Sequence, residues 1–380
     1  MKIGIIGRTN VGKSTLFKAL TLEEVAVEDR PFTTIDPNRG VGYVNFDCPE
    51  KEFHTKCNPH NAPCVDGTRY IPLELIDVAG LIEGAGEGRG LGSKFLSEAM
   101  EADALIEVID ISGKTDGAGM KTEDYDPGRD ISMVKEELKV WLKSIILRYR
   151  PKSGEDIVNN IYKGLTGLKM NRDTVKMGIK ELDIKELNDA TAEKLAEYMI
   201  EKDKPVIVAC NKMDTTPDLD KKLADLRSRF KYTFVPCSAA AELTLKEAEK
   251  HGYIKYNEKS DFTVIKAGDS EQKKALDIIK RITQKFSGTG IAELVKEAVF
   301  MVKKYKVVFT VEDEKKLTDG NGRVLPDAYL VAPEHTPRDV AGLVHSDFVE
   351  KYKGAIDCRT GLKIKNDEPV KNGQVIKIIV

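Results

Sequence analysis

Short apolar runs alternate along the chain with segments of helical periodicity. The continuous apolar runs 3–6, 104–111 and 205–210 are typical of strands buried on both faces of a parallel sheet. Residues 41–46, 70–76 and 232–235 predict three more strands. Such an alternation of strands and helices predicts an α/β fold.

Helical spacing dominates the long interval before residue 205. Apolar residues recur every three or four positions over residues 131–149, at Ile131, Val134, Leu138, Trp141, Leu142, Ile145 and Tyr149, and Pro151 ends the pattern. A second helix is expected over 188–200. The preceding stretch 113–129 is rich in Gly and Asp and predicts a flexible boundary. The interval 116–204 is therefore expected to be a helical insertion.

Further helices are predicted at 272–286 and 291–303, after a polar stretch around 256–270. Beyond Tyr305 the composition changes: a strand at 307–311 precedes a turn at 319–322, and a helix starts at Thr336 with Pro337 and Asp339 as N1 and capping-box residues. Asn372 and Gly373 predict a closing hairpin before a last strand at 374–380. We expect a small β-grasp-like domain over 305–380, an insertion over 116–204, and one α/β domain made of 1–115 and 205–304.

Composition narrows the functional classes. The chain has 380 residues, 41% of them hydrophobic, with 60 basic and 62 acidic side chains and a net charge of −2. Charge is therefore dense but balanced, and no overall positive field indicates a nucleic-acid partner. No apolar run approaches membrane-spanning length, and Met1 leads into a strand rather than a signal peptide, so we expect no membrane contact and a cytoplasmic location.

A phosphate-binding loop follows the first strand. Gly7 and Gly12 bracket four residues before Lys13 and Ser14, which gives G-x-x-x-x-G-K-S between a strand and a helix. Glycines let backbone N–H groups point at an anion, and the helix N-terminus and Lys13 add positive charge. Lys13 is the expected catalytic cation and Ser14 an Mg²⁺ ligand. The expected nucleotide contacts in this loop are Gly7, Asn10, Val11, Gly12, Lys13, Ser14 and Thr15.

Two further segments are expected beside the phosphates. Asp77 ends a buried strand and Gly80 follows it, where nucleotide-binding sheets place a water-mediated Mg²⁺ ligand and a backbone contact to the γ-phosphate. Residues 81–92 hold five glycines and predict a mobile switch. The segment 28–40 breaks periodicity with two prolines and predicts an exposed loop that can reach the phosphates.

A base-recognition loop is predicted after the strand at 205–210. A carboxylate at Asp214 accepts from both N1–H and the 2-amino group of guanine, a donor pair that adenine lacks. Asn211 is expected to tie this loop to the phosphate loop, and the stem of Lys212 to cover one face of the base. After the next strand, Ser238 and Ala239 are expected to bring a backbone N–H to guanine O6.

Six cysteines show no disulfide-scaffold pattern, and Cys210 and Cys237 lie in strand contexts as small buried hydrophobes. Five soft ligands gather within one short stretch: Cys48, His54, Cys57, His60 and Cys64. They are sufficient for zinc, although no pair has the spacing of a usual structural site. The alternative is a solvated loop whose thiols are open to oxidation.

Taken together, the phosphate loop, PFTTIDPN, DVAGLIEGAGEGRGLG, NKMD and SAA resemble the Obg-like translation-associated GTPases, most closely their YchF branch in its archaeal form. The resemblance covers nearly the whole chain, and HSDFVEKYKGAIDCRTG is similar to the TGS module of that family. It implies a P-loop NTPase with a Ras-like G domain, a helical insertion and a C-terminal TGS domain. It also implies GTP as ligand, with ribosome or rRNA reached through the helical and TGS domains.

Carried over by position, the resemblance makes Thr34 a catalytic switch threonine that joins Ser14 on Mg²⁺, with Asp77 acting through water and Gly80 contacting the γ-phosphate. It makes Asn10 the ligand of a stimulating K⁺. Two positions depart from relatives. Bacterial and eukaryotic YchF proteins commonly have a glutamate-ended motif instead of NKMD and prefer ATP, whereas this chain has Asp214. Leu81 stands where Ras-like enzymes use glutamine, and no histidine of the kind found in some Obg relatives replaces it, so the water-positioning group is unassigned.

Three functions fit these residues. The first is a slow GTPase switch that depends on Mg²⁺ and K⁺. The others are an ATP-preferring ATPase of the YchF type and a nucleotide-gated binding scaffold with negligible hydrolysis.

Overall fold

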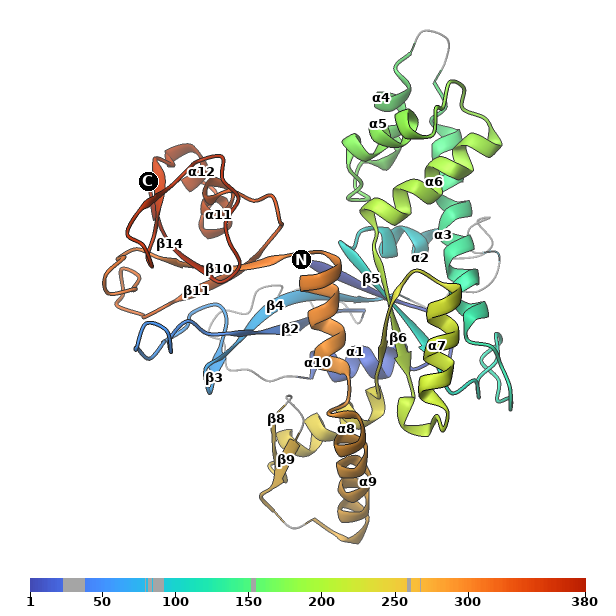
Figure 1. The fold of residues 1–380 in the computed structure, drawn as a ribbon, viewed down its shortest axis with the longest axis horizontal. Helices are drawn as coiled ribbons and strands as arrows, with labels where there is room; N and C mark the ends of the chain where they lie inside the picture. The colour runs from blue at the N-terminus through green and yellow to red at the C-terminus, as the bar shows by residue number, and fades with distance from the viewer. Residues whose placement is uncertain are drawn as a thin grey trace.

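The computed structural model describes residues 1–22, 38–78, 80, 84, 92–151, 155–257, 261–266 and 268–380. Thr34, Leu81 and most of the expected loop 28–40 and glycine-rich switch 81–92 lie outside these residues. A central sheet carries a helical arm on one side and a second, smaller sheet at one end (Figure 1). A hairpin packed against helices extends from the other side of the central sheet (Figure 1).

The central sheet has the strand order β2-β4-β1-β5-β6-β7, and the short β3 pairs with β4. Strand β2 runs antiparallel to β4, whereas β4, β1, β5, β6 and β7 are parallel. All side chains of β5 are buried, as its continuous apolar run predicts. This topology confirms the expected P-loop α/β fold. The bounds are β1 Lys2–Ile6, β2 Arg39–Asp47, β3 Cys64–Val65, β4 Thr68–Asp77, β5 Ala104–Asp110, β6 Val206–Asn211 and β7 Thr233–Pro236.

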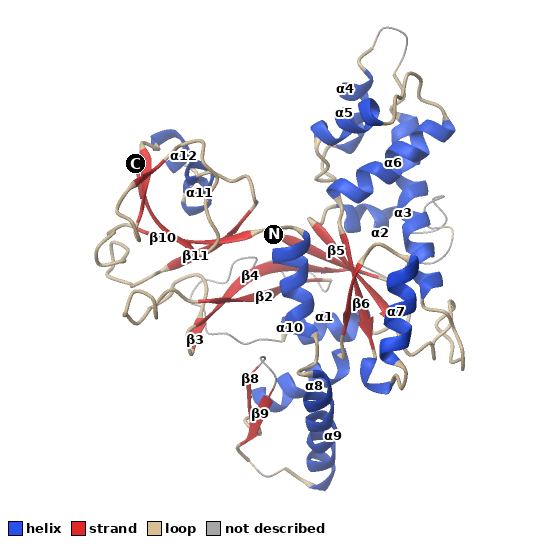
Figure 2. Cartoon of the chain, viewed as in Figure 1, coloured by secondary structure: helices blue, strands red, loops and turns tan. Residues whose placement is uncertain are grey.

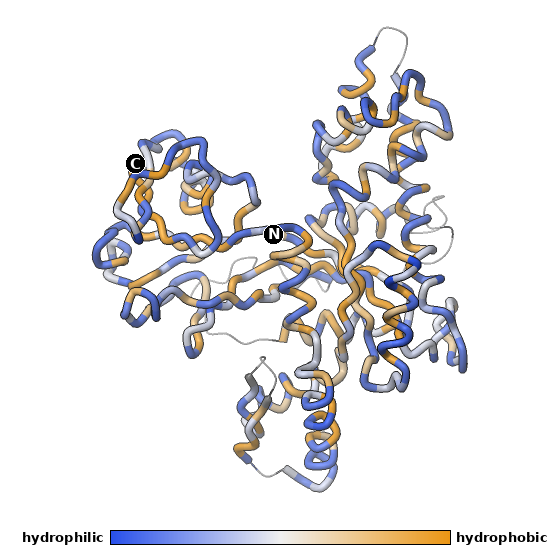
Figure 3. The backbone as a smooth tube through the Cα atoms, in the orientation of Figure 1, coloured by the Kyte–Doolittle hydropathy of each residue, from blue (hydrophilic) through white to orange (hydrophobic). Residues whose placement is uncertain are grey.

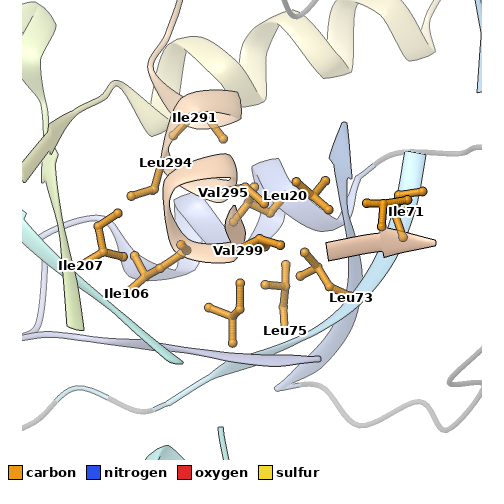
Figure 4. Packing of buried hydrophobic residues seen from close by; sticks show 14 of the residues in the cluster. Leu20, Ile71, Leu73, Leu75, Ile106, Ile207, Ile291, Leu294, Val295 and Val299 are labelled. Carbon is orange, nitrogen blue, oxygen red and sulfur yellow. The ribbon is translucent and has the colours of Figure 1, made fainter. Parts of the chain in front are cut away.

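Helices pack on both faces of this sheet. One face is covered by α1 (Lys13–Thr21), α8 (Ala239–Lys250) and α10 (Ile291–Lys296), and α10 continues as a π-helix over Glu297–Val302. Figure 4 shows Leu294 and Val299 from this helix above Leu75 and Ile106 of the strands. The other face carries α2 (Gly92–Met100), the short 3₁₀ turn Met213–Thr215 and α7 (Leu219–Arg229).

The helical arm lies between β5 and β6. It contains α3 (Gly128–Arg148), α4 (Ile157–Leu165), α5 (Arg172–Glu181) and α6 (Asp189–Asp203), drawn in blue in Figure 2. The periodicity predicts α3 and α6, but α4 and α5 are short and were not expected. The side chains of Asp156 and Asn171 cap these two helices by accepting backbone N–H groups of the first turn. Among the described residues, none of the helices is both long and apolar enough to cross a bilayer.

The polar stretch around 256–270 contains strands that the sequence did not predict. Strands β8 (Ile254–Asn257) and β9 (Asp261–Val264) form a hairpin against α9 (Ser270–Phe286). Ile254 and Phe262 of this hairpin are buried, in a small cluster with Leu245 and Ile279. Each strand alternates apolar and polar residues over only four positions, which is a weak signal within a polar stretch, and the pairing depends on this local cluster.

The C-terminal sheet has the order β11-β10-β14-β12-β13, packed against α11 (Pro337–Val344), with the short α12 (Phe348–Lys351) following. The Thr336 capping box is present, and the Thr336 N–H donates to Asp339 Oδ2 at 2.8 Å. The helix ends at Val344. The strands are β10 Lys306–Val311, β11 Asp327–Val331, β12 Gly354–Asp357, β13 Lys363–Ile364 and β14 Gln374–Ile379.

The hairpin predicted at Asn372 and Gly373 is wrong. Strand β14 pairs in parallel with β10 and antiparallel with β12, so no strand directly before the turn pairs with it. Instead, the Val307 N–H donates to Asn372 Oδ1 at 2.9 Å, and the Gly373 N–H donates to Val307 O at 2.7 Å. Asn372 and Gly373 therefore lead into the parallel pairing of β14 with β10 rather than close a hairpin.

The two sheets share one hydrophobic core. Figure 3 shows hydrophobic positions gathered in the strands of both, and one cluster joins Ile3 of β1 to Val307 and Phe309 of β10. The Phe46 ring of β2 lies 5.9 Å from that of Phe300 and 6.3 Å from that of Phe309. The C-terminal sheet is therefore docked on the extended end of β2 and β4.

Phe309 tests this docking. It is fully buried at the junction, with the Arg69 guanidinium 5.4 Å from its ring centroid. Phe309→Ala should lower the free energy of unfolding by about 3–5 kcal/mol, because the two sheets cannot close the resulting cavity completely. Urea unfolding followed by circular dichroism measures this. The control Leu362→Ala removes a side chain that is 68% exposed and should change stability by less than about 0.5 kcal/mol. Equal effects of the two variants would mean that the junction contributes nothing.

Candidate functional site

The parallel strands bring the expected motifs to one edge of the sheet. Ile5 of β1 is in register with Asp77 of β4, so the ends of these neighbouring strands meet. The loop after β1 has positive φ at Gly7 (140°), Asn10 (63°) and Gly12 (102°). A Cβ at Gly7 would lie 2.4 Å from Val108 O, and one at Gly12 would lie 2.2 Å from Asn211 Nδ2. Both positions therefore require glycine.

Lys13 lies within this loop and is only 8% exposed. Its Nζ donates to Arg8 O at 2.6 Å. Burial lowers the pKa of Lys13, although the nearby Asp77 carboxylate opposes that shift. Helix α1 begins at Lys13, and its N-cap Gly12 supplies no side-chain cap. The loop therefore combines a buried ammonium with a helix N-terminus that no side chain caps, a combination suited to an anion.

Ser14 and Asp77 form a candidate cation site beside the lysine. Ser14 Oγ donates to Asp77 Oδ2 at 3.1 Å, whereas Asp77 Oδ1 is buried and has no hydrogen-bond partner among the described residues. Burial raises the pKa of Asp77, against the opposing effects of Ser14 and Lys13. A hydroxyl beside an unsatisfied carboxylate oxygen fits a hard divalent cation such as Mg²⁺.

Gly80 approaches the same place. A Cβ added to it would lie 3.4 Å from Lys13 Nζ and 2.9 Å from Thr9 Cγ2. The backbone after β4 is thus held against the phosphate loop, as expected from the sequence. Thr34 and Leu81, which were also expected at this site, lie outside the described residues.

Asn211 joins the phosphate loop to the base-recognition loop. It is 4% exposed, and its Nδ2 donates to Val11 O at 2.8 Å, which is the connection that the sequence predicts. Its Oδ1 accepts the Ala239 N–H at 3.0 Å. The Ala239 N–H, which was expected to meet guanine O6, is therefore donated to Asn211 in this structure. Ser238 caps α8 by accepting the Ala241 N–H at 3.3 Å.

The neighbouring Lys212 and Asp214 differ in their surroundings. The backbone of Lys212 is left-handed, and its Nζ donates to Asp110 Oδ2 at 2.8 Å, Thr115 Oγ1 at 3.1 Å and Asn10 O at 3.2 Å. Asp214 is exposed, and its carboxylate makes no hydrogen bond or ion pair with any described residue. The lysine stem is thus fixed in place while the carboxylate keeps all its acceptor sites.

Several contacts that the sequence does not predict surround the loop. Arg8 donates to Gly117 O at 2.6 Å and its Nε lies 2.8 Å from Asp130 Oδ1. Asn10 Nδ2 donates to Gly119 O at 2.8 Å. The segment expected to be a flexible boundary is therefore attached to the phosphate loop. The sequence signals this segment only through its Gly- and Asp-rich composition. That composition does not distinguish a flexible linker from a segment that packs against the phosphate loop.

Asp110 anchors the segment 113–129. It is buried at the end of β5, accepts from Thr115 Oγ1 at 2.6 Å, and bonds Ser112 through both N–H and hydroxyl. Although burial alone would raise the pKa of Asp110, the hydrogen bonds from Lys212, Ser112 and Thr115 hold it below its usual value. A charged Asp110 thereby anchors both the Lys212 stem and the segment over the phosphate loop.

The cysteine-rich loop lies at the other end of β4 from Asp77. Cys48, Cys57 and Cys64 converge there with Glu50, with their candidate ligand atoms all within 4.8 Å of one another. The two histidines do not take part: His54 is exposed, and His60 Nδ1 lies 3.1 Å from Asp327 Oδ1. The predicted set of five soft ligands is thus reduced to three thiols, with a carboxylate that was not expected.

Comparison with known proteins agrees with this geometry. Residues 2–148 match the family model described as 50S ribosome-binding GTPase, and residues 209–313 match that of the Obg-like GTPase YGR210-like, G4 motif-containing domain. The GTP-binding protein MJ1332 of Methanocaldococcus jannaschii is 42% identical over 388 residues, which cover 99% of this chain and 98% of that protein.

Two solved structures are similar over the whole chain. The crystal structure of a GTP-binding protein from Pyrococcus horikoshii has a TM-score of 0.80 at 30% identity, covering 100% of this chain and 99% of that one. The Schizosaccharomyces pombe YchF GTPase has a TM-score of 0.59 at 18% identity, covering 100% of this chain and 97% of that one, and supports the fold. The chain therefore belongs to the Obg-like GTPase family and has the fold of a YchF GTPase.

Proposed function

We propose that this GTP-binding protein is a slow, Mg²⁺- and K⁺-dependent GTPase switch that acts in the cytoplasm on the ribosome or its rRNA. The observation that carries the nucleotide part is the two-sided hydrogen bonding of Asn211. This residue sets the phosphate loop and the base loop at a fixed separation, with Lys13 at one end and the unpaired carboxylate of Asp214 at the other. A guanine nucleotide satisfies both ends.

The chemistry of this site is charge neutralisation and positioning. The buried Lys13 and the N-terminus of α1 stabilise negative charge on the β- and γ-phosphates, and the loop N–H groups, including those of Val11 and Thr15, orient them. Ser14 and Asp77 would hold Mg²⁺, which supplies further charge neutralisation, and the family resemblance adds Thr34 as a ligand. In this proposal Gly80 donates its N–H to the γ-phosphate, and Asn10 lends its amide oxygen to K⁺.

Two contacts support transmission of the nucleotide state to the helical arm. The Gly84 N–H, in the expected switch, donates to Glu137 Oε1 of α3 at 2.6 Å. Arg8 of the phosphate loop pairs with Asp130 of the same helix. A change in either loop on hydrolysis therefore acts on α3 directly. In this proposal the insertion 116–204 and a TGS domain at 305–380 report the state of the GTPase domain, 1–115 with 205–304, to a ribosomal partner.

The alternatives differ in what they hydrolyse. A YchF-type ATPase would release phosphate from ATP in preference to GTP, and a nucleotide-gated scaffold would release almost none from either. Phosphate release over hours in K⁺ buffer, with each nucleotide and with and without ribosomes, separates the three. GTP-specific release that ribosomes accelerate is the expected result, whereas no release above the level of a Lys13→Ala variant would favour the scaffold.

Base choice can be tested at Asp214. Its carboxylate can accept two guanine donors, each charge-assisted bond contributing about 1.5–3 kcal/mol, so GTP should bind over ATP by roughly 10² to 10⁴-fold. Xanthine presents an acceptor where guanine presents its amine. Asp214→Asn should therefore weaken GTP and strengthen XTP in isothermal titration.

The matched control for this test is Asp220→Asn, which makes the same change at an exposed carboxylate in the first turn of α7. It should leave all three affinities unchanged. If the unmodified protein binds ATP as tightly as GTP, the carboxylate does not read the base, and the ATPase alternative replaces our proposal.

The potassium site can be tested at Asn10. The side-chain nitrogen of Asn10 donates to Gly119 O, and the side-chain oxygen can therefore face a cation. GTP hydrolysis should be faster in KCl than in NaCl at equal ionic strength, and Asn10→Ala should abolish the difference. Asn10→Asp keeps an oxygen but loses the donor to Gly119, so it should retain the difference. Equal rates of the unmodified protein in both salts would contradict a K⁺ role.

A further inference from the structure

The thiol cluster at the far end of β4 is built from three separate backbone elements. Cys48 follows β2 directly, Cys57 lies in the connecting loop, and Cys64 starts β3. Glu50 completes the set, and its Oε2 accepts the Cys57 N–H at 3.0 Å, which orients the carboxylate toward the thiols. Sequence spacing hides this convergence because the pairing of β3 with β4 brings Cys64 back to the end of β2.

A buried arginine, Arg69, lies against this cluster. Its side chain is fully buried, and its two terminal nitrogens donate to backbone carbonyls: Nη1 to Ala62 O at 2.7 Å and Nη2 to Leu325 O. Its Nε donates to Cys48 Sγ at 3.5 Å, and no described carboxylate pairs with it. A buried guanidinium needs a compensating negative charge. Cys48 Sγ, the ligand atom that Arg69 contacts, would supply part of that charge as one of the thiolates around a bound ion.

The donor set matches a soft, four-coordinate ion. Tetrahedral Zn²⁺ with Zn–S bonds of about 2.3 Å holds its sulfur atoms about 3.8 Å apart. The four candidate atoms lie within 4.8 Å of one another, so binding requires each pair of sulfur atoms to contract by at most about 1 Å. A site of three thiolates, one carboxylate and Zn²⁺ has an excess of two negative charges, and the buried Arg69 offsets one of them.

We propose that Cys48, Glu50, Cys57 and Cys64 bind one structural Zn²⁺ ion that fixes the C-terminal sheet against the central sheet. Cys57 and Cys64 flank the strip of loop that contacts residues 324–328. In that strip the Asn58 N–H donates to Val324 O at 2.9 Å, the His60 N–H donates to Pro326 O at 2.7 Å, and Asn61 Oδ1 accepts the Ala328 N–H at 2.9 Å. An ion held by both cysteines fixes both ends of the strip.

Side-chain contacts extend the same interface on either side. His60 pairs with Asp327, and Arg359 donates to both carboxylate oxygens of Glu52, at 2.6 and 2.7 Å. The Arg359 guanidinium also lies 5.5 Å from the Phe53 ring centroid. The loop from Cys48 to Cys64 thus makes a large part of the docking contacts, although it contains almost no regular secondary structure. A cross-link within the loop is the physical means of keeping it ordered.

The test measures metal directly. Protein purified with reductant and without a metal-affinity tag should contain one Zn²⁺ per chain by plasma mass spectrometry. Replacement by Co²⁺ should give thiolate-to-metal charge-transfer bands and the visible spectrum of a tetrahedral site. A mercurial that modifies thiols should release the ion from the unmodified protein, which is a readout independent of any variant.

Variants assign the ligands. Cys57→Ser and Cys64→Ser should each lose the Zn²⁺ and lower the thermal unfolding midpoint of the C-terminal sheet. The control Cys358→Ser changes another half-buried, free thiol and should keep the ion. GTP titration shows whether the variants are folded, because the phosphate loop lies at the other end of β4. The proposal fails if the reduced, unmodified protein holds no stoichiometric Zn²⁺ and takes up no Co²⁺, or if Cys358→Ser loses the ion as readily as the other two variants.

Discussion

The site depends on one buried amide. Asn211 lies at the end of β6 and bonds a backbone group on each side, the carbonyl of Val11 in the phosphate loop and the N–H of Ala239 at the start of α8. A Cβ on Gly12 would collide with its Nδ2, so the glycine of the phosphate loop and the asparagine of the base loop require each other. Because the amide is buried, losing either bond would leave a backbone group unsatisfied. The separation of the two loops is thereby fixed by the protein alone.

A second polar network builds on that amide and reaches the helical arm. Asp110 stays charged in a buried position because Lys212, Ser112 and Thr115 donate to it. The same lysine bonds the phosphate loop through Asn10 O, and Asn10 in turn donates to Gly119. The segment before α3 is thus attached to the loop that surrounds the phosphates. This arrangement connects the arm to the phosphate loop through side-chain hydrogen bonds.

The opposite end of the sheet serves a structural role. Strands β2 and β4 extend past the nucleotide edge, and their far ends carry both the aromatic contacts to Phe300 and Phe309 and the cysteine-rich loop. Arg69 links the two, since it lies over the Phe309 ring and donates to Cys48. One long strand pair therefore has one end at the phosphate loop, near Asp77, and the other end at the junction with the C-terminal sheet, near Cys48.

The sequence by itself determined the fold class, the nucleotide motifs and the family, because these depend on local features. Continuous apolar runs specify buried parallel strands, and fixed spacings of glycine, lysine and serine specify a phosphate loop wherever a strand meets a helix. The link from Asn211 to the phosphate loop was also predictable, since the order of parallel strands brings their carboxyl ends together.

Tertiary structure decided what depends on pairing between distant residues. The parallel pairing of β14 with β10 replaced a hairpin that Asn372 and Gly373 favour locally, and the four-residue strands β8 and β9 form through a small shared cluster. The stretch after β5 looked like a linker but bonds Arg8 and Asn10, more than one hundred residues away in the chain. Glu50 could not be recognised as a partner of three cysteines from spacing alone. In each case the free energy comes from contacts between segments far apart in sequence, which local propensity does not encode.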